Sequence, residues 1–558
     1  MPLPLNPTID ARRAQMLPTL DEAEIARLGR FGETVSFAAG DCLFKAGEIA
    51  PGLFLIRSGA VVVTQGSAHD VIVTHGPGNF LGELAQLSAR PSLVDAEARE
   101  PVEALCIASP RLRDLLVQEA ELGERIMRAL ILRRVGLIET GASGPTIIGH
   151  AGHADVLRLQ DFLRRNGEPH RVLDADSDSC AKTLIDRFRI DPHYLPIVVC
   201  PNGNLLRNPG EHELARCLGL VRPIDPDRIY DAAIIGAGPA GLAAAVYAAS
   251  EGLSVIVLEC RAFGGQAGAS ARIENYLGFP TGITGLALMA RAYNQAQKFG
   301  AEMAIPDQAL ELGADVAGQY FVLAVGEGES VRTRTVVVAS GARYRRLGVE
   351  NLSEFEGTSV HYWASPIEAR LCSGQEVALV GAGNSAGQAA VYLASQVKKV
   401  WLLARGTNLG TTMSRYLVDR IEAQPNIEVR TGTEVTALEG KDGMLAHLRM
   451  RHRPSGEETS HPVQHLFLFI GADPNSDWLA HCNIALDEKG FIRTGNDFGE
   501  GHHALETSRN GVFAIGDVRA GSVKRVAAAV GEGAQVVAAL HAHLARDTAP
   551  ANAPIGRD

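Results

Sequence analysis

The 558-residue sequence lacks a C-x-x-C pair, although it contains eight cysteines spread over its whole length. Cysteines three positions apart form dithiol redox centres and zinc sites, so their absence excludes both motifs. Scattered cysteines in a chain this long also exclude a small scaffold held by disulfides, and we expect all eight to be reduced thiols. They are Cys42, Cys106, Cys180, Cys200, Cys217, Cys260, Cys372 and Cys482.

The sequence also lacks a basic excess and a long apolar segment. Its net charge of -11 argues against nucleic acid or an anionic membrane as the main partner. The first residues contain no apolar stretch of the kind found in secretory signals. The longest uncharged run, residues 232–250, has three glycines and a proline, which predict a strand, a turn and a helix rather than a membrane span. We therefore expect a cytoplasmic protein.

Glycine is abundant, with 59 residues, and its distribution divides the chain into segments. Residues 1–140 alternate short apolar runs with glycine turns, which predicts an antiparallel β-roll or jelly roll that ends in a helix over 109–136. Residues 145–222 predict the order β-α-β-α-β-β-α. Residues 228–546 contain one strand–turn–helix unit twice, and residues 547–558 form a tail. The sequence predicts a multidomain protein.

The first strand–turn–helix unit, residues 231–241, carries a complete G-x-G-x-x-G pattern. Gly236 permits a tight turn, Gly238 lets the backbone approach a diphosphate, and Gly241 lets the helix pack on the strand. The N–H groups that open a helix favour negative charge. Glu259 follows the next strand, at the spacing where a ribose hydroxyl needs an acceptor. The unit predicts a dinucleotide site.

The second unit, residues 376–386, has Gly381, Gly383 and Ala386 at the same spacing. The strand after it ends at Arg405, where the first unit has an acid. An arginine there can pair with a 2′-phosphate, which favours NADPH over NADH. A solvated surface arginine, with NADH as the nucleotide, stays open as the alternative.

A third stretch, residues 511–517, is an apolar strand that brings Gly516 and Asp517 to the expected start of another helix. A carboxylate there can bind a ribityl chain, and a helix N-terminus can stabilise a reduced flavin. Two dinucleotide sites in one segment predict a flavin–nicotinamide oxidoreductase with one fixed and one exchanging dinucleotide.

Residues 228–545 resemble the low-molecular-weight thioredoxin reductases through the motifs at 264–267, 272–280, 338–342 and 513–517. The resemblance implies two Rossmann-like α/β domains in a homodimer. One binds FAD (228–343 and 465–546), and the other, inserted at 344–464, binds NAD(P)H. It implies that FAD contacts Gly236, Gly238, Gly241, Glu259, Gln266, Asn275, Gly516 and Asp517.

The family's redox-active C-A-T-C is missing from this resemblance. Trp363 and Pro366 stand where its two cysteines would be, and neither can form a thiolate or a mixed disulfide. The nearest thiol, Cys372, is expected to be a buried apolar residue. The catalytic residues are therefore not identified, and electrons must leave for an external acceptor, either a protein or a small molecule.

The middle segment, 145–222, resembles a thioredoxin or glutaredoxin, with Pro196 at the position of that fold's cis proline. The turn that would carry its cysteines has none. His150, His153 and Asp155 on that turn are too sparse a ligand set, so we expect no metal. A docking or dimerising module and a redox module that lost its thiols both remain open.

The N-terminal segment resembles a cyclic-nucleotide-binding domain, in which Gly82 and Glu83 would meet the ribose. Ser92 stands where that family has an arginine for the cyclic phosphate, and Arg90 lies two residues earlier. Cyclic nucleotide binding and a ligand-free interaction domain both stay open. No helix-turn-helix follows, which excludes a transcription factor of this class. The residues that carry the spacing are Gly40, Gly47, Gly52, Phe54, Ile56, Gly59 and Val61.

The sequence as a whole predicts an FAD-dependent NAD(P)H oxidoreductase with a regulatory N-terminal module. A non-enzymatic sensor that responds to flavin, NADPH or a cyclic nucleotide is one alternative. Electron transfer like that of the ferredoxin–NADP reductases that lack the cysteine pair is the other.

Overall fold

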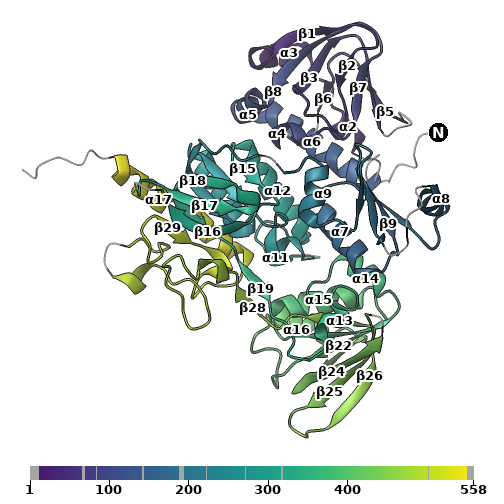
Figure 1. The fold of residues 1–558 in the computed structure, drawn as a ribbon, viewed down its shortest axis with the longest axis vertical. Helices are drawn as coiled ribbons and strands as arrows, with labels where there is room; N and C mark the ends of the chain where they lie inside the picture. The colour runs from purple at the N-terminus through teal and green to yellow at the C-terminus, as the bar shows by residue number, and fades with distance from the viewer. Residues whose placement is uncertain are drawn as a thin grey trace, which may run out of the picture.

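The structure, a computed structural model, describes residues 12–65, 70–82, 84–88, 90–140, 144–187, 191, 194–221, 223–270, 272–315, 318–441, 443–499 and 502–548 (Figure 1). The N-terminal segment (12–140) lies at the top of Figure 1 and the middle segment (144–221) at the right. A first α/β unit lies at the left and a second at the bottom. In the part of the chain described, no helix is both long and apolar enough to cross a membrane.

The N-terminal segment consists of two four-stranded antiparallel sheets, ordered β1-β8-β3-β6 and β2-β7-β4-β5. Its strand β3 is buried on both faces, because Leu53 and Leu55 pack in one core and Phe54 and Ile56 in another. The strands are β1 (Glu33–Phe37), β2 (Cys42–Phe44), β3 (Gly52–Ser58), β4 (Val61–Gln65), β5 (Asp70–His75), β6 (Phe80–Leu81), β7 (Asp95–Ala98) and β8 (Val102–Ala108). The helices are α2 (Arg13–Met16), α3 (Glu22–Leu28), η1 (Gly29–Phe31), α4 (Ala85–Ser88), α5 (Ser109–Gln118) and α6 (Ala120–Thr140).

The single helix predicted over 109–136 is wrong, because the chain breaks into α5 and α6 at Glu119. Glu119 leaves helical geometry, and its buried carboxylate forms ion pairs with Arg27 and Arg30. A buried carboxylate needs such partners. The ion pairs hold the bend, and no apolar periodicity could show them.

The middle segment has the predicted element order, β-α-β-α-β-β-α. In its sheet, ordered β10-β9-β11-β12, β9 and β10 are parallel and the other pairs are antiparallel. The Leu195–Pro196 peptide bond is cis. The elements are β9 (Thr146–Gly149), α7 (Ala154–Arg165), β10 (Arg171–Asp174), α8 (Ser179–Arg187), β11 (Ile197–Val199), β12 (Leu205–Arg207) and α9 (Glu211–Cys217).

The expectation of eight reduced cysteines is wrong for one pair, because Cys200 and Cys217 form a disulfide. Cys200 directly follows β11 and Cys217 ends α9, and their Cα atoms lie 6.6 Å apart, within the range that a disulfide spans. The fold of the middle segment brings the two together, whereas their spacing along the chain resembles no known motif.

The first α/β unit has a seven-stranded sheet, ordered β15-β14-β13-β18-β17-β16, with β29 paired to β18. Alternate residues of β13 face opposite sides, so Ile234 and Ile235 pack in different cores. The strands are β13 (Ile229–Ile235), β14 (Val255–Leu258), β15 (Glu302–Ala304), β16 (Ala309–Ala314), β17 (Phe321–Val325), β18 (Ser330–Val338) and β29 (Val512–Ala514). The helices are α10 (Pro239–Ser250), α11 (Gly265–Gly268), α12 (Gly285–Lys298), η3 (Gly326–Gly328), η4 (Asp477–Leu479), η5 (Gly495–Phe498), η6 (Gly516–Val518) and α17 (Val526–Thr548).

The second α/β unit has a parallel sheet, ordered β20-β27-β21-β22-β23, and an antiparallel sheet, β24-β25-β26. The chain enters it through β19 and returns through β28, which pair with each other. The strands are β19 (Ala342–Tyr344), β20 (Val360–His361), β21 (Glu376–Val380), β22 (Lys399–Leu403), β23 (Ile427–Arg430), β24 (Thr433–Lys441), β25 (Met444–His452), β26 (Glu458–Pro462), β27 (His465–Leu468) and β28 (Ala472–Pro474). The helices are α13 (Leu352–Phe355), α14 (Pro366–Leu371), α15 (Asn384–Ala394) and α16 (Arg415–Glu422).

Candidate functional site

The glycine turn of the first unit joins β13 to α10 and is sterically specific. Gly236 has φ +111°, and a Cβ added to it would lie 2.3 Å from the Ala339 carbonyl oxygen. A Cβ on Gly241 would lie 1.9 Å from the Gly236 carbonyl oxygen. Gly238 is different, because the nearest atom to its added Cβ is the Gly265 Cα, at 3.9 Å. Two glycines close the turn, and the third leaves open space beside the backbone.

Glu259 directly follows β14, as the sequence predicts, and its carboxylate is fixed against this turn. One oxygen accepts the Ala237 N–H at 2.9 Å, and the other accepts the Arg261 N–H at 3.3 Å. Carboxylate oxygens retain further lone pairs when they accept one N–H each, so Glu259 can still accept a hydroxyl.

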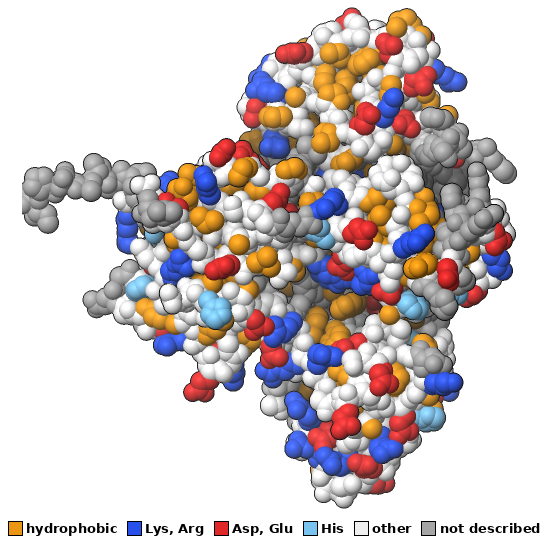
Figure 2. Space-filling model, viewed as in Figure 1, with side chains coloured by type: hydrophobic (Ala, Val, Ile, Leu, Met, Phe, Trp, Pro, Cys, Tyr) orange, Lys and Arg blue, Asp and Glu red, His pale blue; other side chains and the backbone are white. Residues whose placement is uncertain are grey.

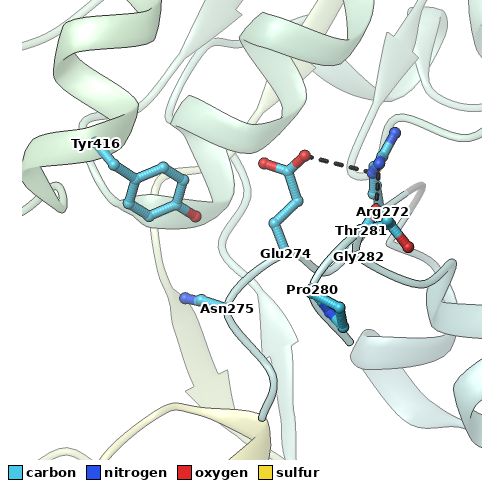
Figure 3. A pocket seen from close by; sticks show the side chains of 7 residues that line it. All are labelled: Arg272, Glu274, Asn275, Pro280, Thr281, Gly282 and Tyr416. Carbon is cyan, nitrogen blue, oxygen red and sulfur yellow. Dashed lines mark hydrogen bonds and ion pairs between the residues drawn. The ribbon is translucent and has the colours of Figure 1, made fainter. Parts of the chain in front are cut away.

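Gln266 lies in the short helix α11 and Asn275 on a loop of the first unit. The Gln266 side-chain amide donates to the Ala342 carbonyl, at the point where the chain leaves for the second unit. Asn275 lines a cavity of about 410 Å³ (Figure 3). Tyr416 lines the same cavity from α16, and Arg420 of α16 pairs with Glu274, so the cavity lies between the two units. Its other lining residues are Arg272, Glu274, Pro280, Thr281 and Gly282.

Gly516 and Asp517 follow β29, but the prediction that they open an α-helix is wrong. They lie in the 3₁₀ turn η6, and α17 starts only at Val526. Gly516 has φ +72°, and its N–H donates to Glu532 of α17 at 2.6 Å. Burial raises the pKa of Asp517, while Lys524 opposes that effect. The turn is therefore held by the Glu532 side chain from within α17, and not by the N-terminus of a helix.

The glycine turn of the second unit joins β21 to α15 and is built similarly. A Cβ on Gly381 would lie 2.6 Å from the Phe469 carbonyl oxygen, whereas one on Gly383 would meet nothing within 4 Å. Ala386 occupies the third position and is fully buried. The loop after β22 folds back onto this turn, because Thr412 donates to the Ala382 carbonyl at 2.7 Å.

Arg405 is exposed just after β22, and the sequence missed the charged residues around it. Arg451 and Arg453 form ion pairs with the Glu434 carboxylate, and Arg405 acts on it electrostatically. The Arg451 hydrogen bond is the main cause that holds the pKa of Glu434 below its usual range. Over the lobe that contains β24–β26, Figure 2 shows basic and acidic side chains interspersed. The arginines alternating at 449–453 were the available signal.

The stretch 80–92 resembles the phosphate cassette of cyclic-nucleotide-binding domains and is called the cassette here. Its described residues contact side chains of the same segment. Arg133 donates to the Gly82 carbonyl at 2.9 Å, and the Gln86 amide donates to the Gly52 carbonyl at 2.7 Å. A Cβ on Gly82 would lie 2.3 Å from the Gln86 side-chain oxygen. Glu83, the predicted partner of Gly82, lies outside the described residues.

Arg90 does not face the cassette but joins three parts of the molecule. Its guanidinium lies 3.1 Å from a carboxylate oxygen of Glu168 in the middle segment and 3.2 Å from the Tyr293 hydroxyl in the first unit. Arg134 of α6 pairs with the same Glu168 at 2.8 Å. Ser92 is buried and donates to the Val94 carbonyl. The cation expected near a cyclic phosphate is therefore part of an ion-pair network between segments.

Comparison with known proteins identifies the parts. The pyridine nucleotide-disulphide oxidoreductase model matches residues 230–533, more than half of the chain. The chain belongs to this family. A cyclic nucleotide-binding domain model matches residues 34–119. The thioredoxin reductase of Mycolicibacterium smegmatis is 33% identical over 311 residues, which are 55% of this chain and 93% of that protein.

Solved thioredoxin reductases superpose on the same part. The Lactococcus lactis enzyme in its FR conformation has 27% identity and a TM-score of 0.52, and covers 57% of this chain and 99% of its own. The T. acidophilum enzyme has 28% identity and a TM-score of 0.53, and covers 57% of this chain and 100% of its own. The chain is thus a thioredoxin reductase-like oxidoreductase of an FAD-dependent family, whose thioredoxin reductases use FAD and NADPH.

Trp363 and Pro366 stand at the two positions that the resemblance assigns to the redox pair, and neither carries a thiol. The Trp363 indole N–H donates to Glu368 at 3.1 Å, and Pro366 is the first residue of α14, whose cap is Ser365. Cys372 is fully buried, and burial raises the pKa of its thiol to about 12. These positions therefore serve a capped helix and a packed core rather than thiolate chemistry.

His150, His153 and Asp155 do not gather as one ligand set, although the His153 Nδ1 lies 3.8 Å from an Asp155 carboxylate oxygen. His153 caps α7, the role that a local interpretation would give to Asp155, while His150 lies 2.8 Å from Asp176. His150, Asp174 and Asp176 do place their ligand atoms within 4.8 Å of one another. His150 and Asp176 are exposed, and exposed acidic groups often cluster without a metal.

Proposed function

We propose that this chain takes a hydride from NADPH onto bound FAD and reduces an acceptor outside its own chain. The observation that carries the proposal is the combination of two glycine turns that admit a diphosphate with a 363–366 segment that holds no cysteine. In each cycle NADPH is oxidised to NADP⁺ and the acceptor gains two electrons. The acceptor is a protein or a small molecule.

The residues of the first unit fit FAD. The space beside Gly238 admits the diphosphate, and Glu259 accepts a ribose hydroxyl. Asp517 binds the ribityl chain, with Gly516 setting its turn. Gln266 approaches the flavin from α11 and Asn275 from a loop. When bound, FAD supplies the hydride acceptor and the outlet for two electrons.

The second unit would hold the nicotinamide nucleotide at Gly381, Gly383 and Ala386. Arg405 binds the 2′-phosphate and favours NADPH, and NADH is the weaker alternative. Arg451 and Arg453 add positive charge on the same rim, although Glu434 neutralises part of it.

The remaining parts are interaction modules in this proposal. Residues 1–140 form a β-roll of the cyclic-nucleotide-binding kind, and 145–222 form a thioredoxin-like domain without its redox pair. The FAD-binding domain comprises 228–343 and 465–546, and the NADPH-binding domain 344–464. The protein is a cytoplasmic homodimer. A cyclic nucleotide would meet Gly82 and Glu83, but Arg90 faces elsewhere, which supports docking instead.

Anaerobic stopped-flow reduction tests the function. The purified protein should be yellow, NADPH should bleach the flavin faster than NADH does, and one class among disulfides, quinones, ferredoxin and oxygen should reoxidise it quickly. A folded protein that neither contains nor binds FAD would refute the proposal.

A sensor is the second candidate, and the Arg90–Glu168 network favours it because that network links the cassette segment to the first unit. Flavin reduction by NADPH that no acceptor of the panel reverses in repeated turnover would support the sensor over the enzyme.

A further inference from the structure

The middle segment is docked on the first unit beside Glu259 through charged groups. The Arg261 Nε donates to the Glu211 carboxylate at 2.9 Å, and its guanidinium also lies 3.3 Å from Asp161. The Asn166 side-chain amide donates to the Arg261 carbonyl at 3.1 Å. These contacts hold α7 and α9 against the loop that follows β14.

Arg165, the last residue of α7, points across this interface. Its Nη2 donates to the Gly265 carbonyl at 2.9 Å. Its Nε is buried and has no hydrogen-bond partner in the parts of the chain that the structure describes. A buried guanidinium donor without a partner is costly, and a water molecule or an anion within reach would satisfy it.

The point that Arg165 reaches is the edge of the diphosphate cradle. A Cβ added to Gly265 would lie 3.1 Å from the Gly238 Cα, so the two glycines face each other closely. Gly238 is where the backbone leaves room for the diphosphate. The Arg165 guanidinium therefore contacts the residue, Gly265, that lies directly against Gly238 and its open space.

Arg165 interacts electrostatically with groups on both sides of this contact. Burial lowers the pKa of Arg165, while the carboxylates of Asp161 and Glu259 act to raise it. Burial also raises the pKa of Tyr344 to about 12; Arg165 acts to lower that pKa and Asp517 to raise it. Arg165 thus lies within electrostatic range of Glu259 and of Tyr344, which itself feels Asp517.

We propose that Arg165 binds the diphosphate of FAD, so that the FAD site is shared between the first unit and the middle segment. The proposal rests on the FAD assignment made above. The glycine turn offers only backbone N–H groups to two negative charges, and a guanidinium adds charge-assisted hydrogen bonds in fork geometry. A segment without redox thiols thereby has a direct role in holding the cofactor.

The test uses full-length protein stripped of flavin and titrated with FAD and with ADP, which carries the same diphosphate without the flavin. Arg165→Met should raise the dissociation constants of both ligands about 10- to 100-fold. Arg165→Lys keeps the charge without the fork and should give an intermediate loss. Unfolding curves of the apo-proteins show whether each variant folds. If Arg165→Met does not fold, the dissociation constants of Arg165→Lys test the proposal.

Two matched controls separate contact from docking. Arg158→Met removes an arginine of α7 that pairs with Asp155 inside the middle segment, and should leave both constants unchanged. Glu211→Gln weakens docking through Arg261 without touching Arg165, and should change them less than twofold. Equal losses in Glu211→Gln and Arg165→Met, or an unchanged ADP constant in Arg165→Met, would overturn the diphosphate contact. If wild-type protein binds neither ligand, the FAD assignment itself fails.

Discussion

The two glycine turns share a backbone design but differ in what surrounds them. At the Gly236 turn, Glu259 is bonded to the turn itself and the middle segment reaches Gly265 through Arg165. Near the Gly381 turn, Arg405 is exposed after β22. Among the described residues, neither the N-terminal nor the middle segment forms a hydrogen bond with this turn. A covered turn suits a dinucleotide that stays bound, and an open one suits a dinucleotide that exchanges.

The third position of each turn offers the largest test of this comparison. Gly241→Ala places a methyl group 1.9 Å from a carbonyl oxygen and should cost about 3 kcal/mol of stability together with bound FAD. Ala386→Gly removes the corresponding methyl group from the second turn and should cost only about 1 kcal/mol. Thermal unfolding and flavin absorbance of both variants measure the difference.

The control for this pair of variants is the amount of nucleotide bound at each turn. Gly241→Ala should leave NADP⁺ binding intact if the second unit still folds, and Ala386→Gly should leave bound FAD at the wild-type level. Equal FAD loss in both variants would show that the turns are not independent.

The second unit should also be more sensitive to acid, because it contains a buried histidine pair. His361 and His465 lie 3.0 Å apart, and burial lowers the pKa of His361 to about 3 and of His465 to about 4. Since the unfolded chain binds protons near pH 6.5 and the folded one does not, stability falls as pH drops below that value. The loss at pH 5 is about 2 kcal/mol for each histidine.

Hydrogen exchange at pH 7 and pH 5 measures this effect unit by unit. His361→Phe should reduce the loss in the second unit, whereas His447→Gln, at an exposed site on β25, should not. A wild-type second unit that is equally protected at both pH values would contradict the role of the pair.

Arg405 tests whether the second turn distinguishes NADPH from NADH. Arg405→Ala should raise the Michaelis constant for NADPH about tenfold and leave that for NADH nearly unchanged, because only NADPH carries the 2′-phosphate. Arg415→Ala, which removes an exposed arginine paired with Asp419, is the matched control in the same unit. Equal effects of Arg405→Ala on both nucleotides would remove the phosphate role.

The sequence predicted best what is local and worst what joins distant segments. Strand, turn and helix at Gly236 and Gly381 were predicted because chain neighbours define them. The order of strands and helices along the middle segment followed from apolar runs. The bend at Glu119 and the disulfide of Cys200 were missed, since each depends on residues that only the fold brings near. From the sequence, Arg90 was considered as a partner for a cyclic phosphate bound by its own segment. Its partners in the structure, Glu168 and Tyr293, lie in two other segments.

The same limit applied to the site. The position of Glu259 directly after β14 was predicted from its spacing, but the contact of Arg165 with Gly265 joins parts of the chain that no motif connects. The helix expected at Asp517 is a 3₁₀ turn in the structure. The Gly516 N–H of this turn donates to Glu532, a side chain of α17 that lies far along the chain from the local pattern.

The smallest expected effect concerns Cys372, the thiol closest in sequence to the missing redox pair. With a pKa of about 12 and a fully buried side chain, it is uncharged and inaccessible at neutral pH. Cys372→Ser should therefore change the rate of NADPH-dependent acceptor reduction less than twofold, although a hydroxyl in that core should lower the unfolding temperature. Cys180→Ser, at an exposed thiol, serves as the control. If turnover vanished in Cys372→Ser at unchanged flavin content, electrons would leave through this thiol, and the second unit would carry redox chemistry as well as a nucleotide.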